Sequence, residues 1–200
     1  MRRIALAALT LCTTLALAAG QPPAKPAPKQ PALPPGHPGA PVTVAWPKAK
    51  PADVGSVDAI VGAMYSSIAG APGQPRDWDR YRSLFVPDAR LIAARSGPEG
   101  AATAMYLNIS NFIDTNRNYF DKGGFLDKEI HRKTETFGNM VHVWSTFESR
   151  HSPEDPKPYA RGINSLQLLK DGDRYWIVNV YWDLEREDSL IPACYLPEVK

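Results

Sequence analysis

The chain has 200 residues, 44% of them hydrophobic, and a formal net charge of +2. The first 52 residues contain six of the 23 Lys and Arg residues and no Asp or Glu, so residues 53–200 carry a net charge of −4. A folded region of that sign, without a basic stripe, argues against nucleic-acid binding. Residues 53–200 are long enough for one domain with a sizeable core.

The N-terminus has the pattern of an export signal. Arg2 and Arg3 precede an uncharged run over residues 4–18, and Ala16-Leu17-Ala18 supplies a small-x-small cleavage signal, with Ala18/Gly20 as a second register. The run is shorter than the roughly 20 apolar residues of a transmembrane helix, although an uncleaved anchor is the alternative. We expect residues 1–18 to be a signal peptide. The mature protein is then periplasmic or secreted, with no integral membrane span after cleavage.

A Pro/Ala/Lys-rich segment over residues 19–52 follows the predicted signal peptide. Its prolines disfavour helix and central strand, which predicts an extended spacer. The spacer is either a stalk, a ligand for a proline-recognising partner, or an electrostatic tether to anionic cell-envelope polymers. Cys194 is the only cysteine after the predicted cleavage site, so no intramolecular disulfide is expected, and we expect Cys194 to be a small packed residue.

Three helices are predicted at the start of the domain, residues 53–200. Ser56 can cap a helix whose apolar positions repeat every 3.6 residues up to Ile68, with Gly70 and Pro72 ending it. A short amphipathic helix is expected over Asp77–Phe85. A third is expected over Ser110–Asp121, ended by Gly123 and Gly124.

Strands make up most of the remaining domain. Residues 89–94 form a short strand, whereas residues 97–109 fit either a helix opened by a capping box or a turn returning into a strand over 101–108. Four longer strands are expected: Leu126–Thr136, Met140–Arg150, Tyr159–Leu169 and Tyr175–Leu184. The last two flank Asp171-Gly172-Asp173 and form a hairpin. Helices followed by a run of strands predict an α+β fold with an antiparallel sheet.

The last strand is apolar on both faces. Strict alternation places Ile177, Asn179 and Tyr181 on one face and Val178, Val180 and Trp182 on the other. A strand with a single buried face would alternate more cleanly between apolar and polar residues. We therefore expect both faces of this strand to be covered.

The order and spacing of four segments resemble the NTF2-like (SnoaL-like) superfamily: Asp77–Leu91, Phe137–Ser149, Gly162–Gly172 and Trp176–Trp182. The resemblance spans residues 54–185. It implies an α+β NTF2-like cone, in which two to three N-terminal helices pack on a strongly bent antiparallel sheet around a pocket. It also implies a homodimer through the sheet and favours the hairpin interpretation of residues 89–108.

The superfamily includes isomerases, dehydratases and cyclases as well as non-catalytic binding domains, so the resemblance leaves activity open. Ketosteroid-isomerase-like members carry a base on the strand that here spans residues 90–95. The matching position falls at Ala93 or Ala94, so no carboxylate is available there to abstract a proton.

Charged residues on the strands are candidates for the pocket. Glu129, His131, Lys133 and Glu135 are expected on one face, where a solvated or cross-strand-paired surface is the default interpretation. His142 lies among apolar residues and is either structural or catalytic. Glu148 and Arg161 are expected to face each other across adjacent strands, as an ion pair or, at a cone mouth, with Arg161 on a carboxylate ligand.

Four uncharged polar residues complete the candidates. Asn164 and Asn179 interrupt apolar strands and either line a pocket or make turn-edge or dimer contacts. Tyr65 and Tyr106 could donate hydrogen bonds to a ligand, with core packing as the alternative. No metal spacing, nucleotide loop or nucleophile motif is present, and we expect no cofactor and no metal.

We therefore expect an exported domain that binds a small, partly apolar molecule in its cone. The first alternative is an isomerase- or dehydratase-type enzyme, which requires His131 or His142 to lie in the pocket beside a carboxylate. The second is a non-catalytic dimeric module of the cell envelope, which requires the cone to be filled by its own aromatic side chains.

Overall fold

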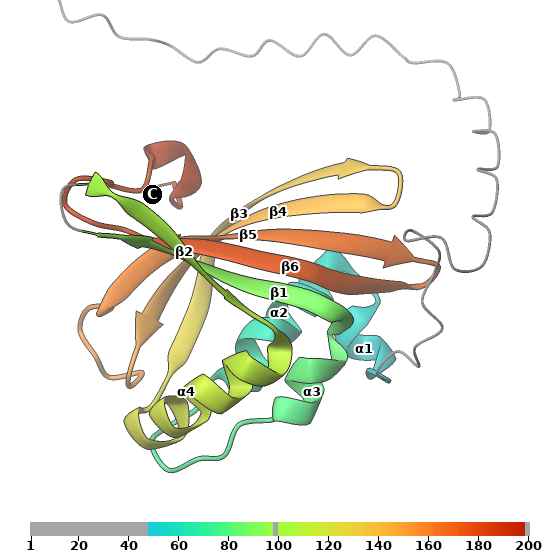
Figure 1. Ribbon diagram of the computed structural model, residues 1–200, viewed down its shortest axis with the longest axis horizontal. Coiled ribbons are helices and arrows are strands. Elements are labelled where there is room, and N and C mark those ends of the chain that lie inside the picture. Colours follow the sequence, from blue (N-terminus) through green and yellow to red (C-terminus); the bar gives the residue numbers. More distant parts are fainter. Residues whose placement is uncertain (1–47, 98–99, 199–200) are drawn as a thin grey trace, which may run out of the picture. The chain divides into compact units, whose positions relative to one another are not determined.

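The structure is a computed structural model that describes residues 48–97 and 100–198 (Figure 1). The expected signal peptide and residues 19–47 of the expected linker lie outside the described residues. Helix α1, Pro51–Val54, begins two residues inside the expected linker, with Pro51 at its N-terminus. A proline is tolerated in the first helical turn because that N–H has no intrahelical partner.

The three predicted helices are present, each capped by a short polar side chain. They are α2 (Val57–Ile68), α3 (Trp78–Ser83) and α4 (Ile109–Gly123). Ser56, Asp77 and Asn108 accept hydrogen bonds from the backbone N–H three residues further along. Helix α3 is shorter than expected because Phe85 already belongs to the first strand.

Six strands form one sheet in the order β2-β1-β6-β5-β4-β3. The strands are β1 (Phe85–Ser96), β2 (Ala102–Leu107), β3 (Leu126–Phe137), β4 (Met140–Arg150), β5 (Ala160–Asp171) and β6 (Arg174–Leu184). Strands β1 and β2 pair antiparallel, so the ambiguous segment returns as a hairpin. The sheet is mixed, however, because β1 pairs parallel with β6. The long connection between these two strands does not impose the antiparallel pairing of a hairpin.

The helices cover one face of the sheet, called the inner face below, and the sheet bends around them (Figure 1). The core lies between the two layers. Ile60 and Ile113 from the helices and Leu166 from the sheet are fully buried in it. This layering is the α+β arrangement that the sequence predicted.

Two β-bulges change which side chains face the helices. In β6, Ile177 pairs with Leu168 and Asn179 with Gln167, so Val178 is an extra residue. Ile177 and Val180 both belong to the core, although strict alternation places them on opposite faces. In β3, a second bulge lies between Glu129 and His131. One extra residue reverses the faces of every residue beyond it.

The C-terminal segment lies against the outer face of the sheet. Thr146 on β4 donates a hydrogen bond to the carbonyl of Tyr195, 2.7 Å away, and the Tyr195 ring lies 5.7 Å from the ring of Trp144. Cys194 is exposed rather than packed, because its neighbour Tyr195 makes these contacts instead. Among the described residues, no helix has the length and apolar character needed to cross a membrane.

Candidate functional site

A cavity of about 450 Å³ lies between the inner face of the sheet and helices α2, α3 and α4. Apolar and aromatic side chains provide most of its lining. The rings come from helices and strands alike, including Tyr81, Phe112, Tyr119, Phe120, Phe147 and Trp182. The volume lies within the range of small-molecule sites in proteins.

The rings are packed against one another, which gives the cavity a rigid wall. The Tyr81 and Phe112 rings stack with centroids 5.6 Å apart, and Trp182 meets Phe112 edge-on at 6.5 Å. Phe120 and Phe125 stack at 3.9 Å. Such pairs add stability beyond the area that they bury, so we expect the wall to keep its shape without a ligand.

A chain of hydrogen bonds runs from the cavity to an ion pair outside it. Ser145 Oγ donates to Glu129 Oε1, and Glu129 is paired with Arg132. Tyr65 Oη lies 2.8 Å from Ser145 Oγ. Because the Ser145 proton is held by the carboxylate, the Tyr65 hydroxyl must be the donor in this contact. Burial raises the pKa of Tyr65 well above its usual range, so the hydroxyl keeps its proton at neutral pH.

Asn164 ends this chain in the cavity lining. Its Nδ2 donates to Tyr65 Oη over 2.9 Å, and the residue is only 7% exposed. Among the described residues, no side chain or backbone group donates to Asn164 Oδ1. The chain therefore leaves this oxygen as an acceptor for a molecule in the cavity.

Asp127 is a second polar group in the lining. Ser149 Oγ donates to Asp127 Oδ1. Burial of the carboxyl raises the pKa of Asp127 to about 7, and the Ser149 hydrogen bond offsets only part of this effect. Asp127 was not among the predicted site residues, because an acid at a strand start usually faces water. Its position opposite Ser149 in the β3–β4 ladder was the available signal.

Of the eight candidate residues, Tyr65 and Asn164 lie together in the cavity lining, and the other six do not. His142 is on the outer face, with Nε2 3.0 Å from Ser165 Oγ. His131 is opposite Thr146 on that face, and its Nε2 is buried without a hydrogen-bond partner among the described residues. Neither histidine lies beside the Asp127 carboxyl in the cavity.

The remaining candidates face outward or lie at the sheet edge. Glu148 and Arg161 are opposite each other in the ladder, as expected, but Glu148 pairs with Arg150 at 3.0 Å and Arg161 with Glu185 at 2.7 Å. The expected ion pair between them is therefore wrong. Long side chains reach partners along the strand or at its end as easily as across it.

Two further residues are absent from the cavity lining. Asn179 is opposite Gln167 on the outer face because the bulge at Val178 shifts it. Tyr106 on the edge strand β2 is 67% exposed. Glu129 was expected on the same face of β3 as His131. Because of the bulge between them, Glu129 lies on the inner face and His131 on the outer face.

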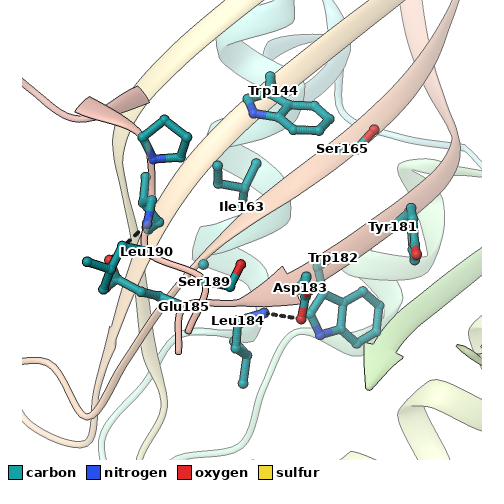
Figure 2. Close-up of a pocket in the computed structure, with 13 residues that line it drawn as sticks. Trp144, Ile163, Ser165, Tyr181, Trp182, Asp183, Leu184, Glu185, Ser189 and Leu190 are labelled. Atoms are coloured by element: carbon teal, nitrogen blue, oxygen red, sulfur yellow. Dashed lines mark hydrogen bonds between the residues drawn. The ribbon is translucent and has the colours of Figure 1, made fainter. Parts of the chain in front are cut away.

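A second, shallower hollow of about 300 Å³ lies on the outer face under the C-terminal segment. Figure 2 shows Trp144, Ile163 and Leu190 around it, together with Glu185 from the end of β6. The Ile191 N–H donates to Glu185 Oε1 over 3.1 Å, which holds this segment in place. Across residues 48–97 and 100–198, no cluster of three or more His, Cys, Asp or Glu side chains could hold a metal ion.

No protein-family model and no curated protein matches the chain. Solved structures are similar in fold at low identity. A protein of unknown function with a cystatin-like fold from Nostoc punctiforme has 10% identity and a TM-score of 0.48, covering 64% of this chain and 87% of that one. An NTF-2 like protein of unknown function from Silicibacter pomeroyi has 14% identity and a TM-score of 0.45, covering 64% and 92%.

The beta subunit of the benzoate 1,2-dioxygenase from Burkholderia mallei is also similar, with 16% identity and a TM-score of 0.43 over 60% of this chain and 84% of that one. Identities this low concern the fold alone. In the described residues, helices pack on one face of a bent six-stranded sheet, and α2, α3 and α4 enclose a cavity with it. This is the α+β arrangement that the sequence resemblance implied.

Proposed function

We propose that the domain binds a small, partly apolar molecule in the inner cavity. The observation that carries this proposal is the open volume of about 450 Å³ inside an aromatic wall, with a few polar groups, among them Asn164 and Asp127, in the lining. Apolar walls with a few placed polar groups are typical of ligand sites. A module with a purely structural role would fill this space with its own side chains.

The test is a cavity-filling substitution. Ala160 lines the cavity, so Ala160→Phe places a ring in it. The matched control is Ala102→Phe, which adds the same ring at an exposed position on β2. Purified wild-type protein and both variants are extracted with solvent, and the extracts are compared by mass spectrometry. We expect a small molecule in the wild-type and Ala102→Phe extracts and its loss from Ala160→Phe. Identical extracts from all three proteins would contradict the proposal.

A second candidate function is proton transfer to or from the bound molecule by Asp127. The observation that favours it is the pKa of about 7 for a carboxyl in the cavity lining, which suits a general acid or base at neutral pH. The test is incubation of the extracted molecule with protein in D₂O. Deuterium incorporation at carbon with wild type, but not with Asp127→Asn, would support this function over simple binding.

Export and dimerisation are part of the proposal. The N-terminal pattern of residues 1–18 supports export, and cell fractionation of the full chain tests it. Exposed apolar residues on or beside the outer face, Val178, Tyr181 and Leu190, support pairing of two copies through the sheet. Sedimentation analysis of the purified protein tests this pairing, and a monomer at micromolar concentration would count against it.

A further inference from the structure

Two side chains in the cavity lining, Asn164 and Asp127, have an acceptor oxygen that receives no hydrogen bond from the described residues. Among the described residues, no group donates to Asn164 Oδ1, and Ser149 donates to Asp127 at Oδ1 alone. The Tyr65 and Ser145 hydroxyl protons are held within their hydrogen-bond chain. Asn116 donates its amide to the Phe112 carbonyl. A molecule that carries hydrogen-bond donors can therefore satisfy both of these acceptors.

Charge gives a second constraint. Asp127 has no ion-pair partner among the described residues, and no cation contributes to its pKa. Arg95 is the one basic residue in the lining, and its side chain is exposed, with Nη2 3.9 Å from Met105 Sδ. A buried carboxylate without a partner is costly, and a cation bound beside it removes that cost.

The surrounding rings favour the same kind of molecule. Tyr81 and Phe112 stack in the lining, and Trp182 meets Phe112 edge-on. The faces of aromatic rings attract cations, and flat apolar groups pack against them.

We propose that the cavity selects a cationic amine with a flat apolar body, whose ammonium group binds the Asp127 carboxylate. The inference rests on the proposed binding function and names its ligand class. Asn164 Oδ1 accepts from a second donor on the molecule, and the ring wall holds the apolar body. Asp127 thereby determines the charge of the molecule that the site binds.

The test uses three matched two-ring probes: 1-naphthylmethylamine, its neutral counterpart 1-naphthylmethanol, and the anion 1-naphthoate. Binding to the full chain is measured by calorimetry. We expect the amine to bind about tenfold or more tightly than the alcohol, as for a hydrogen bond to a charged group. Asp127→Asn should abolish this preference. Asp114→Asn, the same change at an exposed position on α4, should keep the preference.

The pH dependence in the wild type gives a readout that needs no variant. Amine affinity should rise between about pH 5.5 and 8 as Asp127 ionises. The titratable side chains that face Asp127 are Tyr65 on α2, Tyr81 on α3 and Tyr159 before β5, whose pKa values burial raises, so these phenols stay neutral. Tyr119 and Arg95 share the lining, and the His151 ring stacks on Tyr159 at 4.2 Å. Loss of the pH dependence in Asp127→Asn separates Asp127 from His151.

The outcomes distinguish the two proposals. Equal affinity for amine and alcohol, or tighter binding of naphthoate, would overturn the amine selection and leave the binding function standing. Amine binding that strengthens as the pH falls would also overturn it, because the carboxyl would then act in its protonated form. Absence of binding by all three probes would count against both proposals.

Discussion

The buried hydroxyl of Tyr65 allows a quantitative prediction about stability. Tyr65→Phe removes one oxygen that bonds both Ser145 Oγ, at 2.8 Å, and Asn164 Nδ2, at 2.9 Å. The ring itself fits in the same space, so the packing is retained. The change leaves Asn164 Nδ2 without its acceptor in a residue that is only 7% exposed.

An unsatisfied buried polar group costs about 1–3 kcal/mol. Ser145 keeps its hydrogen bond to Glu129, so we count one orphaned donor and expect the free energy of unfolding to fall by about 2 kcal/mol. The assay is urea unfolding followed by tryptophan fluorescence. The matched control is Tyr106→Phe at a 67% exposed position, expected to change stability by less than about 0.5 kcal/mol. Equal effects of the two substitutions would refute the assignment of a buried hydrogen-bond chain.

The remaining predictions concern two glycines and the pH dependence of stability. Gly162→Ala should destabilise by about 1–3 kcal/mol, because the added Cβ would lie 2.4 Å from the Asp183 carbonyl oxygen and 2.9 Å from the Phe147 ring. Gly62→Ala in α2 meets nothing within 4 Å and should stabilise by about 0.5–1 kcal/mol. Chemical unfolding checks both, and a Gly162→Ala variant at least as stable as the wild type would contradict the packing around Gly162. The pKa of Asp127 is raised to about 7 in the folded protein, so ionisation there costs stability, which should fall as the pH rises from about 4.5 to 7. Asp127→Asn should flatten this decline and make the protein more stable than wild type at pH 8; an unchanged pH profile in thermal unfolding would show that the carboxyl is not buried.

Local signals in the sequence predict most of the elements. Ser56 caps a helix in the structure as its position indicated, because capping depends only on the next three residues. The turn Asp171-Gly172-Asp173 joins β5 and β6, with Gly172 at a positive φ of 57°. The paired strands follow from these turns and from apolar patterning.

Side-chain direction beyond a bulge cannot be predicted from alternation. The extra residue at Val178 turns Asn179 outward, and the bulge after Glu129 turns that residue inward. A bulge is stabilised by contacts with neighbouring strands, which a single strand's pattern does not contain. Asp127 was missed for a related reason: its environment is built by Ser149 and by rings from α2, α3 and β6, which are distant in sequence, as well as from the neighbouring α4.

The chain from Asn164 to Glu129 has a consequence for comparing proteins of this shape. Glu129 and Arg132 are absent from the cavity lining, and Arg132 also pairs with Asp58, whose side chain is 92% exposed. Yet the carboxylate of Glu129 fixes where each proton lies along the chain, and so fixes which atom of Asn164 is offered to a ligand. A neutral residue in place of Glu129 would free the Ser145 proton. The same cavity wall could then offer the amide NH₂ of Asn164 to a ligand instead of Oδ1. Two cavities with identical linings can therefore differ in the molecules that they accept, and the difference is encoded in a residue that no ligand touches.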